Sequence, residues 1–180
     1  MNVTKTSLPG VLLVEPTIYG DERGWFAEVF NRELYGTHGL PAEFVQDNQS
    51  FSRRGVLRGL HYQLGKPQGK LVRVLEGQIW DVAVDLRRGS ETFGKWEGFD
   101  LNSTKLRQLW IPEGFGHGFL VLSETATVLY KTTNLYYPEG ERCVKWDDAG
   151  LGIEWPLDGM VPSVSAKDAA GVALADSELP

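Results

Sequence analysis

Cysteine is nearly absent from this chain, because Cys143 is the only one among 180 residues. No internal disulfide can form, so no oxidising compartment is needed, and Cys143 is expected to be a small structural residue. Long apolar runs are absent too, since the one nearest the N-terminus covers residues 11–14, against about 20 for a membrane span. With no secretion signal at the N-terminus, the sequence predicts a cytoplasmic protein without a membrane partner.

Positive charge is in deficit. The chain has 18 Lys and Arg against 24 Asp and Glu, which gives a net charge of −6. Proteins that bind nucleic-acid backbones carry the opposite excess, so no nucleic-acid partner is expected, although local Arg and Lys side chains can still bind a small anion. There is no internal repeat and no linker, and 42% hydrophobic residues are enough for one core. The sequence therefore predicts a single domain, residues 1–180.

Glycine and proline are frequent, at 21 and 9 residues, and they divide the chain into short segments. Most segments alternate apolar and polar residues with the period of two that is typical of strands. The clearest one has Trp80, Val82, Val84 and Leu86 on one face and Asp81, Ala83 and Asp85 on the other. Such a series predicts an all-β sandwich or barrel, with strands at residues 11–15, 25–30, 44–50, 56–63, 71–75, 78–86, 96–101, 108–111, 119–122 and 125–133.

Only two segments look helical. Residues 31–38 follow Asn31, a suitable N-cap, and stop at Gly39. Residues 165–170 begin at Ser165 and carry Asp168 at the third helical position, as in a capping box. The sequence predicts a few short helices beside the strands.

Two of the three histidines have polar neighbours. His61 lies near Arg58, Gln63 and Lys70, in a segment that would otherwise be a buried strand. From spacing alone, a hydrogen-bonded core histidine and a catalytic histidine are equally good interpretations. An imidazole without a metal suits general-base chemistry near neutral pH, whereas His38 is expected to face solvent.

A metal site is the main chemical alternative. Transition-metal sites on this kind of fold need at least three ligands, commonly imidazoles and a carboxylate. The His-x-His pair is missing because Gln63 stands two residues after His61. A site made from His61, His117 and a carboxylate stays open. Motifs for nucleotide hydrolysis, hydride transfer and serine hydrolysis are all missing.

A longer series of motifs resembles the dTDP-4-dehydrorhamnose 3,5-epimerase family. In chain order they are residues 20–24 (GDERG), 44–48 (FVQDN), 55–63 (GVLRGLHYQ), 68–73 (QGKLVR), 81–87 (DVAVDLR), 92–96 (TFGKW), 110–119 (WIPEGFGHGF), 129–134 (LYKTTN) and 138–142 (PEGER). The resemblance covers almost the whole chain. It implies a cupin-type jelly roll, a homodimer, an isomerase with neither metal nor cofactor, and a step in dTDP-L-rhamnose synthesis on a dTDP-linked 4-keto sugar.

The resemblance also implies roles for individual residues. His61 matches the base, Asp168 its carboxylate partner, Lys70 the cation near the C4 oxygen and Tyr130 the proton donor on the opposite face. Without the family, Asp168 would be an acid at a helix start, Lys70 a solvated lysine and Tyr130 a core aromatic. The family positions that contact the nucleotide sugar fall on Arg23, Glu28, Gln46, Asp47, Asn48, Arg58, Gln63, Lys70, His117, Tyr136, Glu141 and Lys167, with Tyr136 matching the aromatic that stacks on thymine.

One conflict with regular strand geometry arises inside residues 56–63. Arg58 and His61 have opposite parity, so a regular strand would point them to opposite faces. Gly59 between them predicts a bulge that brings both side chains to one pocket. Functions that remain open beside the epimerase are a single-carbon epimerase or ketoisomerase, a metal-dependent cupin oxygenase, and a carbohydrate-binding jelly roll without catalysis.

Overall fold

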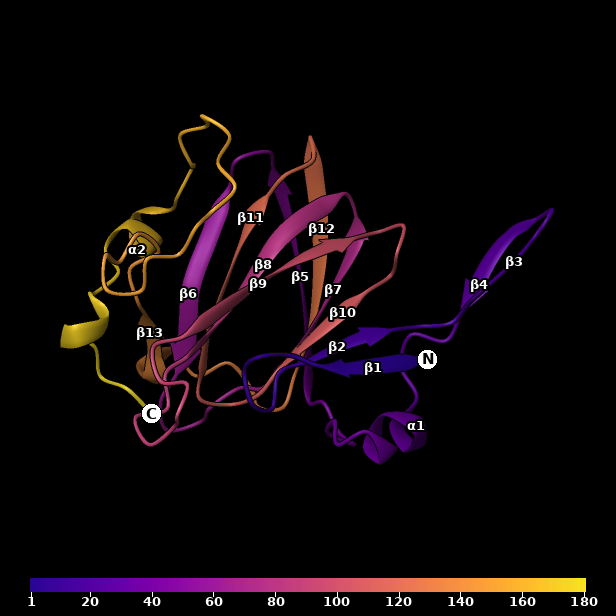
Figure 1. Cartoon of the computed structure of the whole chain (residues 1–180), viewed down its shortest axis with the longest axis horizontal. Helices are drawn as coiled ribbons and strands as arrows, with labels where there is room; N and C mark the ends of the chain where they lie inside the picture. Colours follow the sequence, from indigo (N-terminus) through magenta and orange to yellow (C-terminus); the bar gives the residue numbers. More distant parts are fainter.

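Two antiparallel sheets make up most of the computed structural model, which describes all 180 residues (Figure 1). The six-stranded sheet has the order β1 (Asn2–Lys5), β2 (Leu12–Glu15), β10 (Gln108–Ile111), β7 (Lys70–Glu76), β12 (Thr125–Thr132) and β5 (Gln46–Arg53). The five-stranded sheet has the order β13 (Glu141–Cys143), β6 (Leu57–Gln63), β11 (Phe115–Val121), β8 (Gln78–Asp85) and β9 (Trp96–Asn102). Neighbours far apart in sequence pair within each sheet, as in a cupin-type jelly roll, so the predicted fold class is correct.

The alternation in β8 explains how the core is divided. Val82 and Val84 pack outside the five-stranded sheet, against an apolar cluster that includes Leu151 and Trp155 from the C-terminal segment. Ala83 faces the other sheet and joins the largest cluster. Both faces of β8 are therefore buried, and the predicted alternation separates two cores instead of a core and a solvent face.

The predicted bulge next to His61 is present. His117 on β11 pairs with His61 on β6, but Phe119 pairs with Arg58, so β6 has one extra residue. Gly59 has a φ of 120°, and a Cβ there would lie 2.5 Å from the Cα of Gly118. Only glycine fits this position, because both the backbone conformation and the close approach of β11 exclude a side chain.

The helices begin where the caps predict. Helix α1 (Arg32–Thr37) follows Asn31, whose side chain accepts hydrogen bonds from the backbone N–H groups of Glu33 and Leu34. Helix α2 (Ala166–Ala169) follows Ser165, which accepts from the N–H of Asp168. Two single turns of 3₁₀ helix complete the set, η1 (Pro138–Gly140) and η2 (Leu174–Asp176). None of the helices has the length and apolar character required to cross a membrane.

The boundaries of several strands differ from the prediction. Residues 25–30 were expected to form one strand, but β4 (Gly24–Ala27) ends at Ala27, and the chain then leads into α1. Strands β1, β13 and β3 (Ile18–Asp21) were not expected, because they are short and lack a buried apolar face. The first half of β11 was missed because Gly116 and Gly118 interrupt the apolar pattern.

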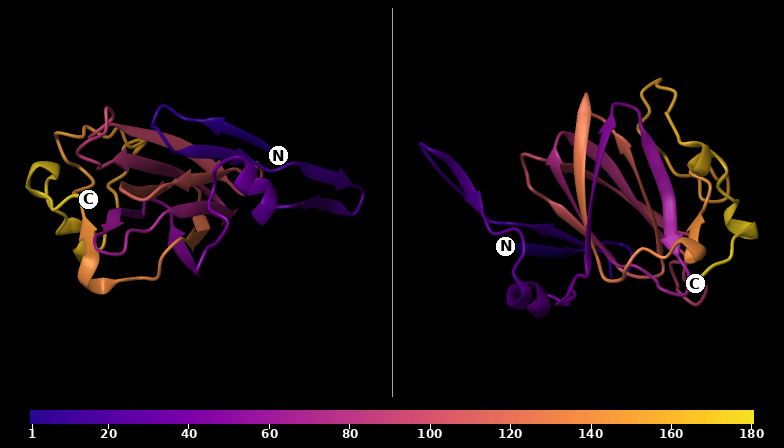
Figure 2. Two further views of the ribbon diagram at one scale, coloured as in Figure 1. Left: turned by 90° about the horizontal axis from the view of Figure 1, so that it is seen from below. Right: turned by 180° about the vertical axis from the view of Figure 1, so that it is seen from behind.

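The β3–β4 hairpin projects away from both sheets, as the views in Figures 1 and 2 agree. It pairs only with itself. Tyr19, Trp25 and Phe26 are 64%, 60% and 70% exposed, although each is large and mostly apolar. An unpartnered apolar surface of this kind is typical of an interaction site.

Candidate active site

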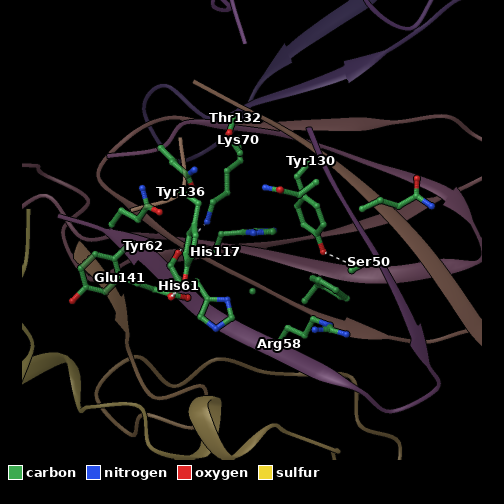
Figure 3. Close-up of a pocket in the computed structure, with 16 residues that line it drawn as sticks. Ser50, Arg58, His61, Tyr62, Lys70, His117, Tyr130, Thr132, Tyr136 and Glu141 are labelled. Atoms are coloured by element: carbon green, nitrogen blue, oxygen red, sulfur yellow. Dashed lines mark hydrogen bonds between the residues drawn. The ribbon is translucent and has the colours of Figure 1, made fainter. Parts of the chain in front are cut away.

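A pocket of about 260 Å³ opens between the two sheets (Figure 3). Side chains from both sheets line it, and most of them are polar. Among its lining residues are Asn48, Ser50, Arg58, His61, Gln63, Lys70, His117, Tyr130, Tyr136 and Glu141. A concave site with converging titratable groups is the best candidate for chemistry in this chain.

His61 on β6 forms a hydrogen-bonded pair with a carboxylate. Its Nε2 donates to Oδ1 of Asp168 in α2, at 2.5 Å, across a separation of 107 residues. The imidazole is partly exposed in the pocket, whereas the Asp168 side chain is only 5% exposed. Because a carboxylate can only accept, this contact places the ring proton on Nε2 and leaves Nδ1 free to take a proton.

Asp168 is held as an anion. Burial raises its pKa, but the hydrogen bond and charge of His61, together with a hydrogen bond from Ser165, outweigh burial and lower the pKa below its ordinary value. Ser165 serves twice, since its hydroxyl donates to Oδ2 of Asp168 at 2.8 Å and also caps α2. The carboxylate therefore orients the imidazole and stabilises its charged form.

Lys70 extends into the pocket from the start of β7 (Figure 3). Its Nζ donates to the backbone oxygen of His61 at 3.3 Å. Burial lowers the pKa of Lys70 to about 8, against the negative charges of Asp81 and Glu141, which raise it. Lys70 therefore carries an ammonium at neutral pH while being poorly hydrated, which strengthens its interaction with a developing negative charge.

Tyr130 on β12 projects into the pocket from the wall opposite His61 (Figure 3). Its hydroxyl is hydrogen bonded to Oγ of Ser50 at 2.8 Å. Burial raises its pKa well above the ordinary value, and the Ser50 hydrogen bond only partly opposes this. The phenol is therefore protonated at neutral pH and can act as an acid.

His117 lies between these groups and has a buried partner of its own. Its Nε2 donates to the two carboxylate oxygens of Asp81, at 2.9 and 3.1 Å. Asp81 is fully buried. Burial lowers the pKa of His117, with the charge of Asp81 working in the opposite direction. The pocket thus contains two imidazoles, each oriented by a carboxylate.

The mouth of the pocket carries a smaller network. Tyr136 donates to Oε2 of Glu141 at 2.5 Å, and Lys167 contacts the same oxygen at 2.5 Å. Gln46 accepts from the backbone N–H of Tyr136 and donates to Asn48. The exposed ring of Tyr136 is therefore held beside charged and amide groups at the rim.

Arg58 and Gln63 line the pocket in different ways. Arg58 donates from Nε to the hydroxyl of Ser52 at 3.1 Å, and its bulged strand lets it share the pocket with His61. The amide of Gln63 is already engaged, since it donates to the backbone oxygens of Lys66 and Leu135 and accepts from the N–H of Tyr137. Gln63 therefore braces the pocket wall.

Three of the residues expected to bind substrate lie elsewhere in this chain. Asp47 sits between the inward-facing Gln46 and Asn48, so strand alternation turns it outward, where it pairs with Lys131 at 2.9 Å. Arg23 lies near the tip of the β3–β4 hairpin, where its guanidinium binds Asp21. Glu28 is exposed just after β4 and does not line the pocket.

Three residues of the site were not predicted from the sequence. Ser50, Asp81 and Ser165 each hold the side chain of an expected site residue. Asp81 had a detectable signal, because it is an acid on a strand whose other positions are nearly all apolar. Ser50 shares the parity of Asn48 on β5, and only the pairing with β12 shows what it contacts.

One group of side chains has the composition of a metal site. Ligand atoms of His61, Cys143 and Asp168 lie within 4.8 Å of one another. However, His61 and Asp168 already satisfy each other through a hydrogen bond. Burial raises the pKa of Cys143 to about 12, so the thiolate that a metal requires is strongly disfavoured. The donor set fits a hydrogen-bonded pair better than a metal centre.

The comparisons with known proteins agree on one family. The family model described as dTDP-4-dehydrorhamnose 3,5-epimerase matches residues 5–176. A protein of that name from Pseudomonas aeruginosa is 54% identical over 179 residues, which cover 99% of this chain and 98% of that protein.

Solved structures give the same result. The crystal structure of an epimerase from Legionella pneumophila in complex with dTDP-4-keto-L-rhamnose matches with a TM-score of 0.96 and 49% identity, over 99% of this chain and 97% of that one. A 3′-monoepimerase from Streptomyces bikiniensis, in complex with dTDP-quinovose, matches with a TM-score of 0.88 and 36% identity, over 94% and 86%. By sequence and by structure, the chain belongs to the dTDP-4-dehydrorhamnose 3,5-epimerase family.

Proposed function

We propose that this chain inverts C3 and C5 of dTDP-4-dehydro-6-deoxy-D-glucose and so forms dTDP-4-dehydro-L-rhamnose for dTDP-L-rhamnose synthesis. The observation that carries the proposal is the pair of opposed groups in one pocket, an imidazole on β6 and a phenol on β12. Each inversion removes a proton next to the C4 ketone and returns one to the other face. A base and an acid on opposite walls meet that requirement.

His61 is the base in this mechanism. Nδ1 takes the proton while Nε2 keeps its hydrogen bond to Asp168, which stabilises the imidazolium that forms. Proton loss leaves an enolate, with negative charge on the C4 oxygen. Tyr130 then donates its phenol proton to the opposite face, and the reaction consumes neither a cofactor nor a metal.

Lys70 stabilises the enolate oxygen, and its pKa predicts how the rate depends on pH. The pKa of about 8 means that most molecules carry the ammonium below pH 8 and lose it above. We expect kcat to fall as pH rises through about 8. Lys70→Arg should move this decline to higher pH, because a guanidinium stays charged. Lys70→Gln should lower kcat about 10²- to 10³-fold and abolish the decline.

Rate profiles between pH 6 and 10 test this assignment. Lys105→Gln is the matched control, because Lys105 is an exposed lysine outside the pocket. An unchanged decline near pH 8 in the Lys70→Arg variant would show that another group titrates there.

The remaining pocket residues bind the nucleotide sugar. Arg58 suits the diphosphate, since a guanidinium can donate two parallel hydrogen bonds to phosphate oxygens. Tyr136 offers an exposed ring at the mouth for stacking on thymine, and Glu141 and Lys167 hold that ring in place. Asn48 and His117 line the wall between these ends. We place the reaction in the cytoplasm.

A homodimer completes the pocket in our proposal. Arg23 and Glu28 match substrate contacts of the family, but both lie outside the pocket of their own chain. The hairpin that carries Arg23 also exposes Trp25 and Phe26. If a second copy of the chain covers these rings, Arg23 of the first copy reaches the pocket of the second. In a symmetric dimer each subunit completes the pocket of the other in this way.

Subunit mixing tests the shared pocket. His61→Ala and Arg23→Ala dimers should each be nearly inactive. After co-refolding, they should recover about a quarter of wild-type activity, because half of the random dimers are mixed and each mixed dimer has one complete pocket. Light scattering should give twice the 20.1 kDa chain mass. A monomer, or a mixture without recovery, would refute the shared pocket.

Incubation with dTDP-4-dehydro-6-deoxy-D-glucose in D₂O tests the function itself. NMR should show deuterium at both C3 and C5 and the L-rhamno configuration in the product. Enzyme dialysed against a chelator should react at the same rate. The second candidate is inversion of one carbon only, which the similarity to a 3′-monoepimerase favours. Product that is deuterated and inverted at one carbon would establish that alternative.

A further inference from the structure

A row of small polar side chains lines the inner face of β5. Asn48, Ser50 and Ser52 stand opposite Tyr130, Val128 and Ala126 of β12, and the side chains of Val128 and Ala126 belong to the core between the sheets. Because alternate residues share a face, all three polar side chains turn toward that interior. Of the three, only Ser50 forms a hydrogen bond with Tyr130, which Figure 3 shows as a dashed line.

The Tyr130 hydroxyl is hydrogen bonded to Ser50 and to no other residue. Ser50 Oγ, at 2.8 Å, is its single hydrogen-bond partner. The ring is fixed by aromatic contacts, with its centroid 6.1 Å from that of His117 and 6.4 Å from that of Phe119. These contacts locate the ring but do not hydrogen bond to its hydroxyl, so Ser50 is the protein group that positions this hydroxyl, and either oxygen can donate.

When Tyr130 donates its proton it becomes a phenolate, which the Ser50 hydroxyl can stabilise. The phenolate left behind lies in a buried position near the negative charge of Asp81, and both conditions disfavour it. A hydroxyl that donates to the phenolate oxygen stabilises it. Ser50 also lines the pocket and is partly exposed, so its own lone pairs can accept from water.

We propose that Ser50 is the residue that positions Tyr130 and reloads it with a proton between inversions; this rests on the proposed function, with Tyr130 as the acid. The phenol O–H bond breaks as the enolate electron pair forms the new C–H bond. The phenolate then takes the Ser50 proton, while Ser50 takes one from water. The hydroxide that remains is neutralised by the proton that His61 removed from the sugar and releases to solvent.

Reloading matters because the substrate has two carbons to invert. One phenol that serves both must regain its proton before the second inversion. Without Ser50, the enolate persists longer and more often recovers a proton from the His61 face, which restores the starting configuration. Loss of Ser50 should therefore separate exchange from inversion and favour the product inverted at one carbon.

A double-mutant cycle tests the inference by following deuterium exchange and product stereochemistry together. Ser50→Ala should lower inversion about 10- to 100-fold, the effect of one hydrogen bond to a developing charge. Exchange at C3 and C5 should stay within about threefold of wild type, because His61 and Lys70 are untouched. Ser50→Thr, which keeps the hydroxyl, should restore inversion. In the Tyr130→Phe background, Ser50→Ala should change nothing further.

The outcomes separate this inference from the proposed function. If Tyr130→Phe loses inversion while Ser50→Ala behaves as wild type, the proposed function stands and the role of Ser50 is refuted. Equal loss of exchange and inversion in Ser50→Ala would also refute it, as would an undiminished effect in the Tyr130→Phe background. If Tyr130→Phe inverts normally, the acid assignment itself fails. Melting temperatures of all variants identify any that fail to fold.

Discussion

His61→Ala should abolish the incorporation of solvent deuterium at both C3 and C5. His61 is a pocket imidazole that a buried carboxylate holds with Nδ1 free, so its loss removes the proposed base for both protons. General-base catalysis contributes about 10² to 10⁴ in rate. We expect turnover to fall by that amount while the protein stays folded, because the imidazole is partly exposed in the pocket.

The matched control is His38→Ala. His38 is exposed at the end of α1, far from the pocket lining, and its loss should leave exchange and turnover unchanged. Proton NMR in D₂O follows both carbons in one experiment. Complete exchange by the His61→Ala variant would remove this imidazole from the mechanism and direct attention to His117.

Tyr130→Phe should separate the two halves of the reaction. The change removes only the hydroxyl, so the base and the lysine still generate the enolate, and exchange should continue. Inversion should fall about 10²- to 10³-fold, because no acid remains on the wall opposite His61. The expected product mixture is deuterated starting sugar with little of the L-configured product, measured by NMR at several times.

Tyr35→Phe is the control for this variant. Tyr35 is also buried, and its hydroxyl also donates a hydrogen bond, to the backbone oxygen of Val29, but it lies outside the pocket. Both variants lose one phenol hydrogen bond, so their stabilities should change by similar amounts of about 1 kcal/mol. If Tyr130→Phe lost exchange and inversion equally, Tyr130 would be acting before the enolate forms.

Most of the fold follows from local patterns in the sequence. Alternation identified the long strands, and the caps at Asn31 and Ser165 identified both α-helices. Gly59 predicted the bulge, because an extra residue at that glycine brings two polar side chains of opposite parity to the same face. The short strands β1, β3 and β13 could not be predicted, since their pairing depends on distant parts of the chain.

The site was less accessible to sequence reasoning. A pattern can nominate His61 as polar in an apolar strand, but Asp168 becomes its partner only through the fold, and the resemblance to the family supplied that pairing. Asp47 was predicted to contact substrate, and its parity relative to Asn48 turns it away from the pocket of its own chain. Arg23 could be placed only from the structure, in which its hairpin pairs with neither of the two large sheets.

The position of Asp168 makes catalysis depend on a locally stable segment. The helix that carries it lies outside β6, together with a C-terminal apolar cluster around Trp155 and Leu151 (Figure 2). No full strand includes this segment, and only two isolated β-bridges, Val56–Ser163 and Val144–Val172, flank the helix. Segments of this kind open without global unfolding. Each opening would break the hydrogen bond between His61 and Asp168 while both sheets stay intact. Activity should therefore be lost at a lower denaturant concentration than the one that unfolds the jelly roll.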